Sequence, residues 1–200
     1  MKKVLVHMEF ALQPIESEAA VLQKLMELSG ESLESLRSRY RKDKNGRPYV
    51  EDSQWFFSIS HTREAMALAF SNEHFVGVDI ESQNREPRSK EIAERFFHGR
   101  ESEWLSSLEV SARAQGFLKI WTAKEAIFKC DQRSFGSLLK TIDLTNFAKQ
   151  NEISKSFFLQ NLESDFSLIS FAQPSLNLIG TLAGKGELDF KLLPSLQTES

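Results

Sequence analysis

Apolar residues follow two periodicities along the chain. In some stretches they alternate with polar residues or run together briefly, which is typical of strands, and in others they recur every three to four residues, which is typical of helices. Strands are predicted at residues 3–10, 55–60, 65–71, 75–81, 157–160, 166–171, 176–182 and 188–192. Helices are predicted at residues 17–28, 32–42, 91–97, 100–108 and 111–129.

The order of these elements predicts an α+β fold. A strand, then helices, then further strands occur twice along the chain, and this repetition suggests two similar lobes. From residue 141 onward, short alternating segments separated by turns suggest a meandering sheet.

Composition narrows the class of protein. With 200 residues, 40% of them hydrophobic and 26% charged, the chain has the make-up of an ordinary soluble domain or of two small lobes. The net charge of −3 argues against a general nucleic-acid binder. The single cysteine, Cys130, excludes an internal disulfide and a cysteine-based zinc site. The sequence has no membrane-length apolar run and no signal-peptide core, so we expect a cytoplasmic protein.

Two acids interrupt or follow a buried strand. Asp79 breaks the apolar run 76–80, and Glu81 lies two positions later, on the same face of the strand. Charged side chains are rarely buried unless they are paired or bind a cation, and Mg²⁺ prefers carboxylate oxygens together with substrate phosphates. An edge strand that emerges into a loop explains the acids equally well. Gly77 would allow another backbone to approach closely.

A third acid lies on the predicted helix 111–129. Leu118, Thr122, Glu125 and Lys129 share one stripe of this helix, while Lys124 belongs to the neighbouring, mostly aromatic stripe. An ordinary ion pair between Glu125 and Lys129, worth roughly 0.2–0.5 kcal/mol, is the simpler interpretation. Lys124 favours a functional one, because a solvated lysine is out of place among aromatic residues.

Two further segments could bind phosphate. His61 follows an apolar strand; it is either a structural residue or a phosphate donor, beside the hydroxyls of Ser60 and Thr62. The segment 37–47 holds six basic residues and one acid, Asp43. Such a run is usually a solvated face, but it could also bind a phosphate ligand or attract an acidic partner.

These motifs, in this order, resemble the 4′-phosphopantetheinyl transferases of the surfactin-synthetase-activating type. The family pattern is a Gly-Lys/Arg-Pro turn, an aromatic-rich strand ending in Ser-His, a strand with Gly, Asp and Glu at alternating positions, and a helix with Trp-x-x-Lys-Glu-Ala/Ser-x-x-Lys. This chain has NGRP at 45–48, SH at 60–61, GVDIE at 77–81 and WTAKEAIFK at 121–129. It departs from the pattern at Ser58, where the family usually has Asn, and in its N-terminal basic segment.

The resemblance implies two similar α+β lobes with the active site in the cleft between them. The N-terminal lobe would span residues 1–74, and the C-terminal lobe, residues 75–200, would carry the metal site. Such enzymes transfer 4′-phosphopantetheine from coenzyme A to a serine of an acyl or peptidyl carrier protein and release 3′,5′-ADP. A monomer is expected, because two lobes already form one cleft.

The resemblance also implies roles for individual residues. Asp79, Glu81 and Glu125 would hold Mg²⁺ with the pyrophosphate of coenzyme A, while Lys124 and Lys129 would neutralise phosphate oxygens. Glu125 would also take the proton of the carrier serine, directly or through a metal-bound water. Five residues would bind coenzyme A: Arg47, Ser60, His61, Lys124 and Lys129. Of these, His61 and Arg47 would contact its 3′-phosphate.

Two other functions remain open from the residues themselves. A metal-dependent phosphodiesterase or nuclease also uses acids and a Lys-Glu pair, although the acidic balance and the Ser-His pair count against it. The second open function is that of a non-catalytic protein that binds coenzyme A or a carrier protein. The carrier could serve fatty-acid, polyketide or peptide synthesis.

Overall fold

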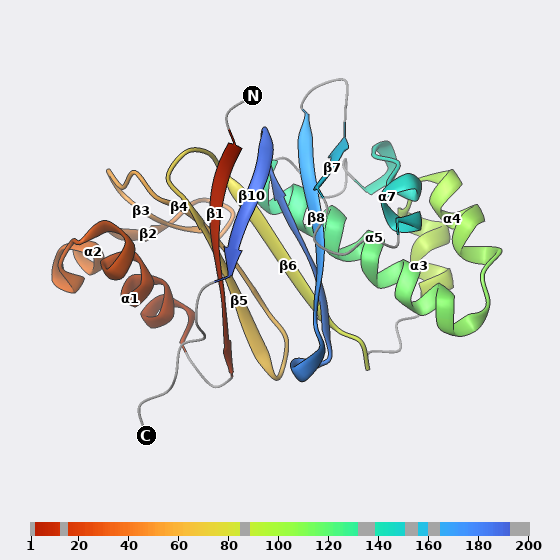
Figure 1. Cartoon of the computed structure of the whole chain (residues 1–200), viewed down its shortest axis with the longest axis horizontal. Helices are drawn as coiled ribbons and strands as arrows, with labels where there is room; N and C mark the ends of the chain where they lie inside the picture. Colours follow the sequence, from red (N-terminus) through yellow and green to blue (C-terminus); the bar gives the residue numbers. More distant parts are fainter. Residues whose placement is uncertain are drawn as a thin grey trace.

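The computed structural model describes residues 3–12, 16–84, 89–131, 139–150, 156–159 and 165–192. Within these residues, helices and strands combine as predicted in an α+β fold (Figure 1). The strands are β1 (Lys3–Leu12), β2 (Tyr40–Lys42), β3 (Pro48–Val50), β4 (Phe56–His61), β5 (Ala65–Ser71), β6 (Val76–Ser82), β7 (Ser156–Leu159), β8 (Phe166–Gln173), β9 (Leu178–Gly184) and β10 (Glu187–Leu192). The helices are α1 (Ser17–Ser29), α2 (Leu33–Arg39), α3 (Ser89–Phe96), α4 (Gly99–Ser106), α5 (Val110–Asp131), α7 (Thr145–Lys149) and the short 3₁₀ helix η1 (Pro174–Leu176).

Two four-stranded sheets share one apolar layer. One sheet has the order β10-β1-β5-β4 and the other β6-β9-β8-β7. Alternation along β5 explains the layer: Ala65, Ala67 and Ala69 face the second sheet and contact its Val78 and Leu182, among others. The intervening residues of β5 face the other way, against α1 and α2, which lie on the left in Figure 1. The helices α3, α4 and α7 lie at the opposite end of the molecule, and α5 extends from that end to the second sheet. None of the described helices is both long and apolar enough to cross a membrane.

Helix α5 packs directly on β6 at Gly77. A Cβ atom at this position would lie 1.9 Å from the carbonyl oxygen of Ala126 and 2.8 Å from the backbone nitrogen of Cys130. The close backbone approach expected at this glycine is therefore present. It brings the face of β6 that carries Asp79 against α5.

Replacing Gly77 with alanine is expected to destabilise the protein by about 1–3 kcal/mol, because backbone atoms must shift to admit the methyl group. Urea denaturation measures the change. Gly99→Ala is the control, since a Cβ there meets nothing within 4 Å. Equal stability of the two variants would contradict the close packing of α5 on β6.

The predicted helix 32–42 is too long. Helix α2 ends at Arg39, and Tyr40–Lys42 forms β2, which pairs with β3 in a hairpin. The carboxylate of Asp43 accepts hydrogen bonds from the backbone N–H groups of Asn45 (2.8 Å) and Arg47 (2.9 Å), so the turn has its own stabilising contacts. These contacts favour the hairpin over a continued helix.

The last strand leaves the meander that the sequence suggests. Strands β7, β8 and β9 are antiparallel neighbours as expected, apart from residue 160, which lies outside the described residues. Strand β10 instead pairs in parallel with β1, from Lys3 opposite Glu187 to Met8 opposite Leu192. Its Leu188 enters the shared apolar layer, which favours this pairing. The N-terminal sheet therefore includes a strand from the C-terminal end of the chain.

Candidate active site

Serine side chains join β4 to β6, where the two sheets meet. Ser58 Oγ accepts a hydrogen bond from the N–H of Val78 (3.0 Å), and Ser60 Oγ accepts one from the N–H of Ile80 (3.2 Å). Ser60 Oγ also donates to Asp79 Oδ1 at 2.7 Å. In this structure the hydroxyl of Ser60 is buried and contacts β6. Its contact with the cofactor stays a prediction.

Asp79 is buried and carries an ion pair. Its side chain points toward α5, from which Lys129 extends so that its Nζ lies 2.8 Å from Asp79 Oδ1. The same ammonium donates to the carbonyl oxygen of Val78 at 3.1 Å. The structure therefore brings together two of the predicted site residues from elements about 50 positions apart in the sequence.

Glu125 shares this region with both acids of β6. The pKa of Glu125 is raised to about 7, chiefly by burial and also by the charges of Asp79 and Glu81, while the charge of Lys129 opposes the shift. A raised carboxyl pKa beside like charges is typical of a site that performs proton transfer or binds a cation.

The residues present fit a hard divalent cation. The donors are all carboxylate oxygens, and their mutual repulsion would be relieved by a positive charge between them. Within the described residues, however, no three His, Cys, Asp or Glu side chains are gathered closely enough to form a ready metal cage. Asp79, Glu81 and Glu125 would have to draw together around the ion.

Lys124 does not contact the acids of β6. Its side chain is buried in the layer of helices, and its Nζ lies 3.0 Å from the Glu101 carboxylate and donates to the carbonyl oxygens of Leu139 (2.7 Å) and Ile142 (2.6 Å). Burial lowers the pKa of Lys124, and Glu101 opposes this shift. An ammonium has three donors, and all three have acceptors here. The predicted contact of Lys124 with phosphate would require these bonds to break.

Glu101, the ion-pair partner of Lys124, is not among the site residues predicted from the sequence. Its fully buried carboxylate accepts hydrogen bonds from the backbone N–H groups of Leu144 (2.8 Å) and His98 (2.9 Å), besides its ion pair with Lys124. Burial raises the pKa of Glu101, and Lys124 opposes it. His98 and Glu101, three positions apart, form a capping box at the start of α4. This spacing is the sequence signal that could have identified Glu101. Glu101 and Lys124 together fix α4, α5 and the segment 139–144.

A cavity of about 220 Å³ adjoins the ion pair. Its lining includes Arg47 and Pro48 of the hairpin, Phe57 of β4 and Lys129 of α5. Arg47 is half-buried, and burial lowers its pKa, but a guanidinium remains charged in proteins. Two cationic side chains therefore border one cavity. His61 is exposed at the end of β4 and, by strand alternation, continues the face of Phe57.

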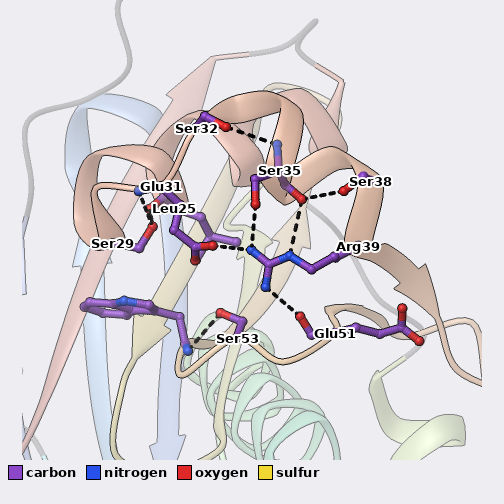
Figure 2. A network of polar contacts seen from close by, with 10 residues as sticks. Leu25, Ser29, Glu31, Ser32, Ser35, Ser38, Arg39, Glu51 and Ser53 are labelled. Atoms are coloured by element: carbon purple, nitrogen blue, oxygen red, sulfur yellow. Dashed lines mark hydrogen bonds and ion pairs between the residues drawn. The ribbon is translucent and has the colours of Figure 1, made fainter.

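The basic segment 37–47 is partly engaged in holding the hairpin. Figure 2 shows Arg39 at the centre of a polar network: it donates to the carbonyl oxygen of Glu51 (2.8 Å) and pairs with the Glu31 carboxylate. Arg41 pairs with the carboxylate of Glu51 at 3.2 Å. Arg39 is partly buried and has partners just after α1 and just after β3, whereas Arg37, Arg41 and the lysines of the segment are exposed.

Comparisons with known proteins identify the family of the chain. The profile that describes the 4′-phosphopantetheinyl transferase superfamily matches residues 75–178, just over half of the chain and the part that carries Asp79, Glu81 and Glu125. The chain is 40% identical over 90 residues to the 4′-phosphopantetheinyl transferase gsp of Aneurinibacillus migulanus, which is 45% of this chain and 36% of that protein. It is 32% identical over 92 residues to the 4′-phosphopantetheinyl transferase Sfp of Bacillus subtilis, which is 46% of this chain and 40% of that protein. The matches thus span less than half the length of these relatives. The chain belongs to the 4′-phosphopantetheinyl transferase superfamily.

Proposed function

We propose that this protein transfers the 4′-phosphopantetheine group of coenzyme A to a serine hydroxyl of an acyl or peptidyl carrier protein and releases 3′,5′-ADP. One observation carries the proposal: Glu125 and Lys129 of α5 face Asp79 of β6, beside a cavity that Arg47 also borders. A carboxylate base and two cations are groups that suit the transfer of a phosphoryl-linked group.

The chemistry divides among the residues as follows. The serine oxygen attacks the phosphorus that carries pantetheine, and the bond from that phosphorus to the leaving phosphate breaks. Glu125 takes the proton of the serine hydroxyl, directly or through a water molecule. Lys129 neutralises charge on the leaving phosphate. When Mg²⁺ is bound, at Asp79, Glu81 and Glu125, it supplies further charge neutralisation on the pyrophosphate.

The nucleotide end of coenzyme A would occupy the cavity between the hairpin and β4. Arg47 offers a planar, bidentate donor there, which suits the 3′-phosphate, and His61 adds a second donor from the end of β4. In this proposal the active site lies between an N-terminal lobe, residues 1–74, and a C-terminal lobe, residues 75–200, whose strand β10 pairs with β1 of the first lobe. The protein would act as a cytoplasmic monomer and bind neither nucleic acid nor membrane.

Arg47→Ala is expected to weaken the binding of coenzyme A by roughly 10- to 150-fold, because a charge-assisted hydrogen bond contributes about 1.5–3 kcal/mol. Binding of 3′-dephospho-coenzyme A should hardly change. Calorimetric titration of both ligands measures the effect. Arg37→Ala, an exposed arginine of the same segment, is the control. Equal weakening for both ligands would exclude a contact of Arg47 with the 3′-phosphate.

Intact-mass spectrometry of an apo carrier protein tests the function directly. After incubation with this protein, coenzyme A and Mg²⁺, the carrier should gain one phosphopantetheine group, and EDTA should prevent the gain. Carriers from fatty-acid, polyketide and peptide synthesis should all be tried. Binding of coenzyme A without any modification would instead indicate the non-catalytic binder. Release of nucleotides from DNA or RNA, suppressed by a chelator, would indicate the phosphodiesterase.

A further inference from the structure

Lys129 is the cation that the structure places among the carboxylates of the site. Its ammonium lies 2.8 Å from Asp79 Oδ1, the same oxygen that accepts the hydrogen bond of Ser60. Its charge also acts on Glu125, one turn earlier on α5. Asp79 is only 7% exposed, so its charge needs a nearby compensating cation. In the protein without metal, Lys129 provides that compensation.

The same ammonium borders the cavity that contains Arg47. Lys129 is partly exposed and lines this cavity, unlike Lys124, whose side chain is fully buried. A lysine side chain is a flexible stem with a compact charge, so it can exchange one anionic partner for another at little structural cost. Lys129 can therefore turn from Asp79 toward an anion in the cavity without unfolding any element.

We propose that Lys129 is an internal counterion that takes the place of the divalent cation on Asp79 and turns to the phosphates of coenzyme A once that cation binds. The inference rests on the proposed function, because it requires a cation site at Asp79 and an anionic ligand in the cavity. Lys129 opposes the cation when the cavity is empty. When the ligand is present, its phosphates attract the displaced ammonium, so each ligand strengthens the binding of the other.

Titration of Mg²⁺ into the chelator-treated protein, with and without coenzyme A, tests this coupling. Lys129→Met keeps an unbranched, flexible side chain of nearly the same length and removes its charge. We expect this variant to bind Mg²⁺ alone more tightly than the unaltered protein, and coenzyme A to strengthen Mg²⁺ binding less in the variant. The coupling lost should be on the order of 5- to 150-fold. Lys129→Arg keeps the charge and should retain the coupling.

Two measurements keep the result interpretable. Lys185→Met is the control. It removes an ammonium that lies 3.6 Å from the carboxylate of Asp131, the last residue of α5, and it should leave Mg²⁺ binding unchanged. Without metal, Lys129→Met should have a lower melting temperature than the unaltered protein. Addition of Mg²⁺ should raise the melting temperature of the variant more than that of the unaltered protein.

The inference is overturned if Lys129→Met binds Mg²⁺ alone no more tightly than the unaltered protein. It is equally overturned if neither protein binds Mg²⁺ in the absence of coenzyme A. Modification of the carrier protein is followed separately by mass spectrometry, so failure of the counterion role and failure of the transferase function give different results.

Discussion

Glu125→Gln is expected to reduce transfer of phosphopantetheine by about 10²–10⁴-fold, the usual contribution of a general base. The amide has nearly the shape of the carboxyl group but accepts no proton, and it also removes one oxygen anion from the predicted Mg²⁺ site. The rate of carrier modification, followed by intact mass at saturating coenzyme A and carrier, measures the loss. Glu103→Gln, an exposed acid on α4, should transfer at the normal rate. Normal turnover of Glu125→Gln would remove Glu125 from the mechanism.

The same substitution should stabilise the metal-free fold at alkaline pH. The carboxyl of Glu125, with its pKa of about 7, retains its proton to near neutral pH in the folded protein but loses it near the ordinary pKa of 4.5 in the unfolded chain. Between these values the folded state binds more protons, so its stability falls as pH rises through this window and stays low above it. Glutamine avoids this loss.

The expected gain for Glu125→Gln above pH 7 is on the order of 1–2 kcal/mol, after allowance for solvent screening of a partly exposed group. Below about pH 4.5 the two proteins should be equally stable. Urea denaturation in EDTA at pH 8 and at the lowest pH where both remain folded checks the sign. A variant that is less stable than the unaltered protein at pH 8 would show that the charged form of Glu125 is not disfavoured by burial.

Glu101→Ala is expected to destabilise the protein by about 3–5 kcal/mol, because it leaves the ammonium of Lys124 buried without its counterion. The backbone N–H groups of His98 and Leu144 lose their acceptor at the same time. Chemical denaturation measures the loss. Glu103→Ala, two positions away and exposed, should change stability by less than about 0.5 kcal/mol.

A double variant separates the ion pair from simple packing. Replacement of Glu101 with leucine and Lys124 with methionine removes both charges together, and we expect it to be more stable than Glu101→Ala. Its transfer activity is also informative. If the double variant folds and transfers at the normal rate, Lys124 serves only to hold α5 in place. A folded double variant without activity would support the predicted contact of Lys124 with phosphate.

The sequence alone determined the α+β class and most of the elements. Strand β5 matches its predicted range, and α1, α4, α5 and β6 match theirs to within one or two residues, because their apolar patterns are local and bounded by turns or glycines. The sequence also located the acids: alternation placed Asp79 and Glu81 on one face of a strand, and helical spacing placed Glu125 and Lys129 on one stripe.

Only the tertiary structure decided which partner each charge has. Local spacing makes Glu125 the natural partner of Lys129, but the packing of α5 on Gly77 brings the ammonium to Asp79. Lys124 pairs with Glu101, which lies on a different helix. Strand β10 likewise pairs with β1, at the other end of the chain. Each of these contacts joins segments that are distant in sequence, so their formation depends on packing of the whole core and leaves no periodic signal in the amino-acid order.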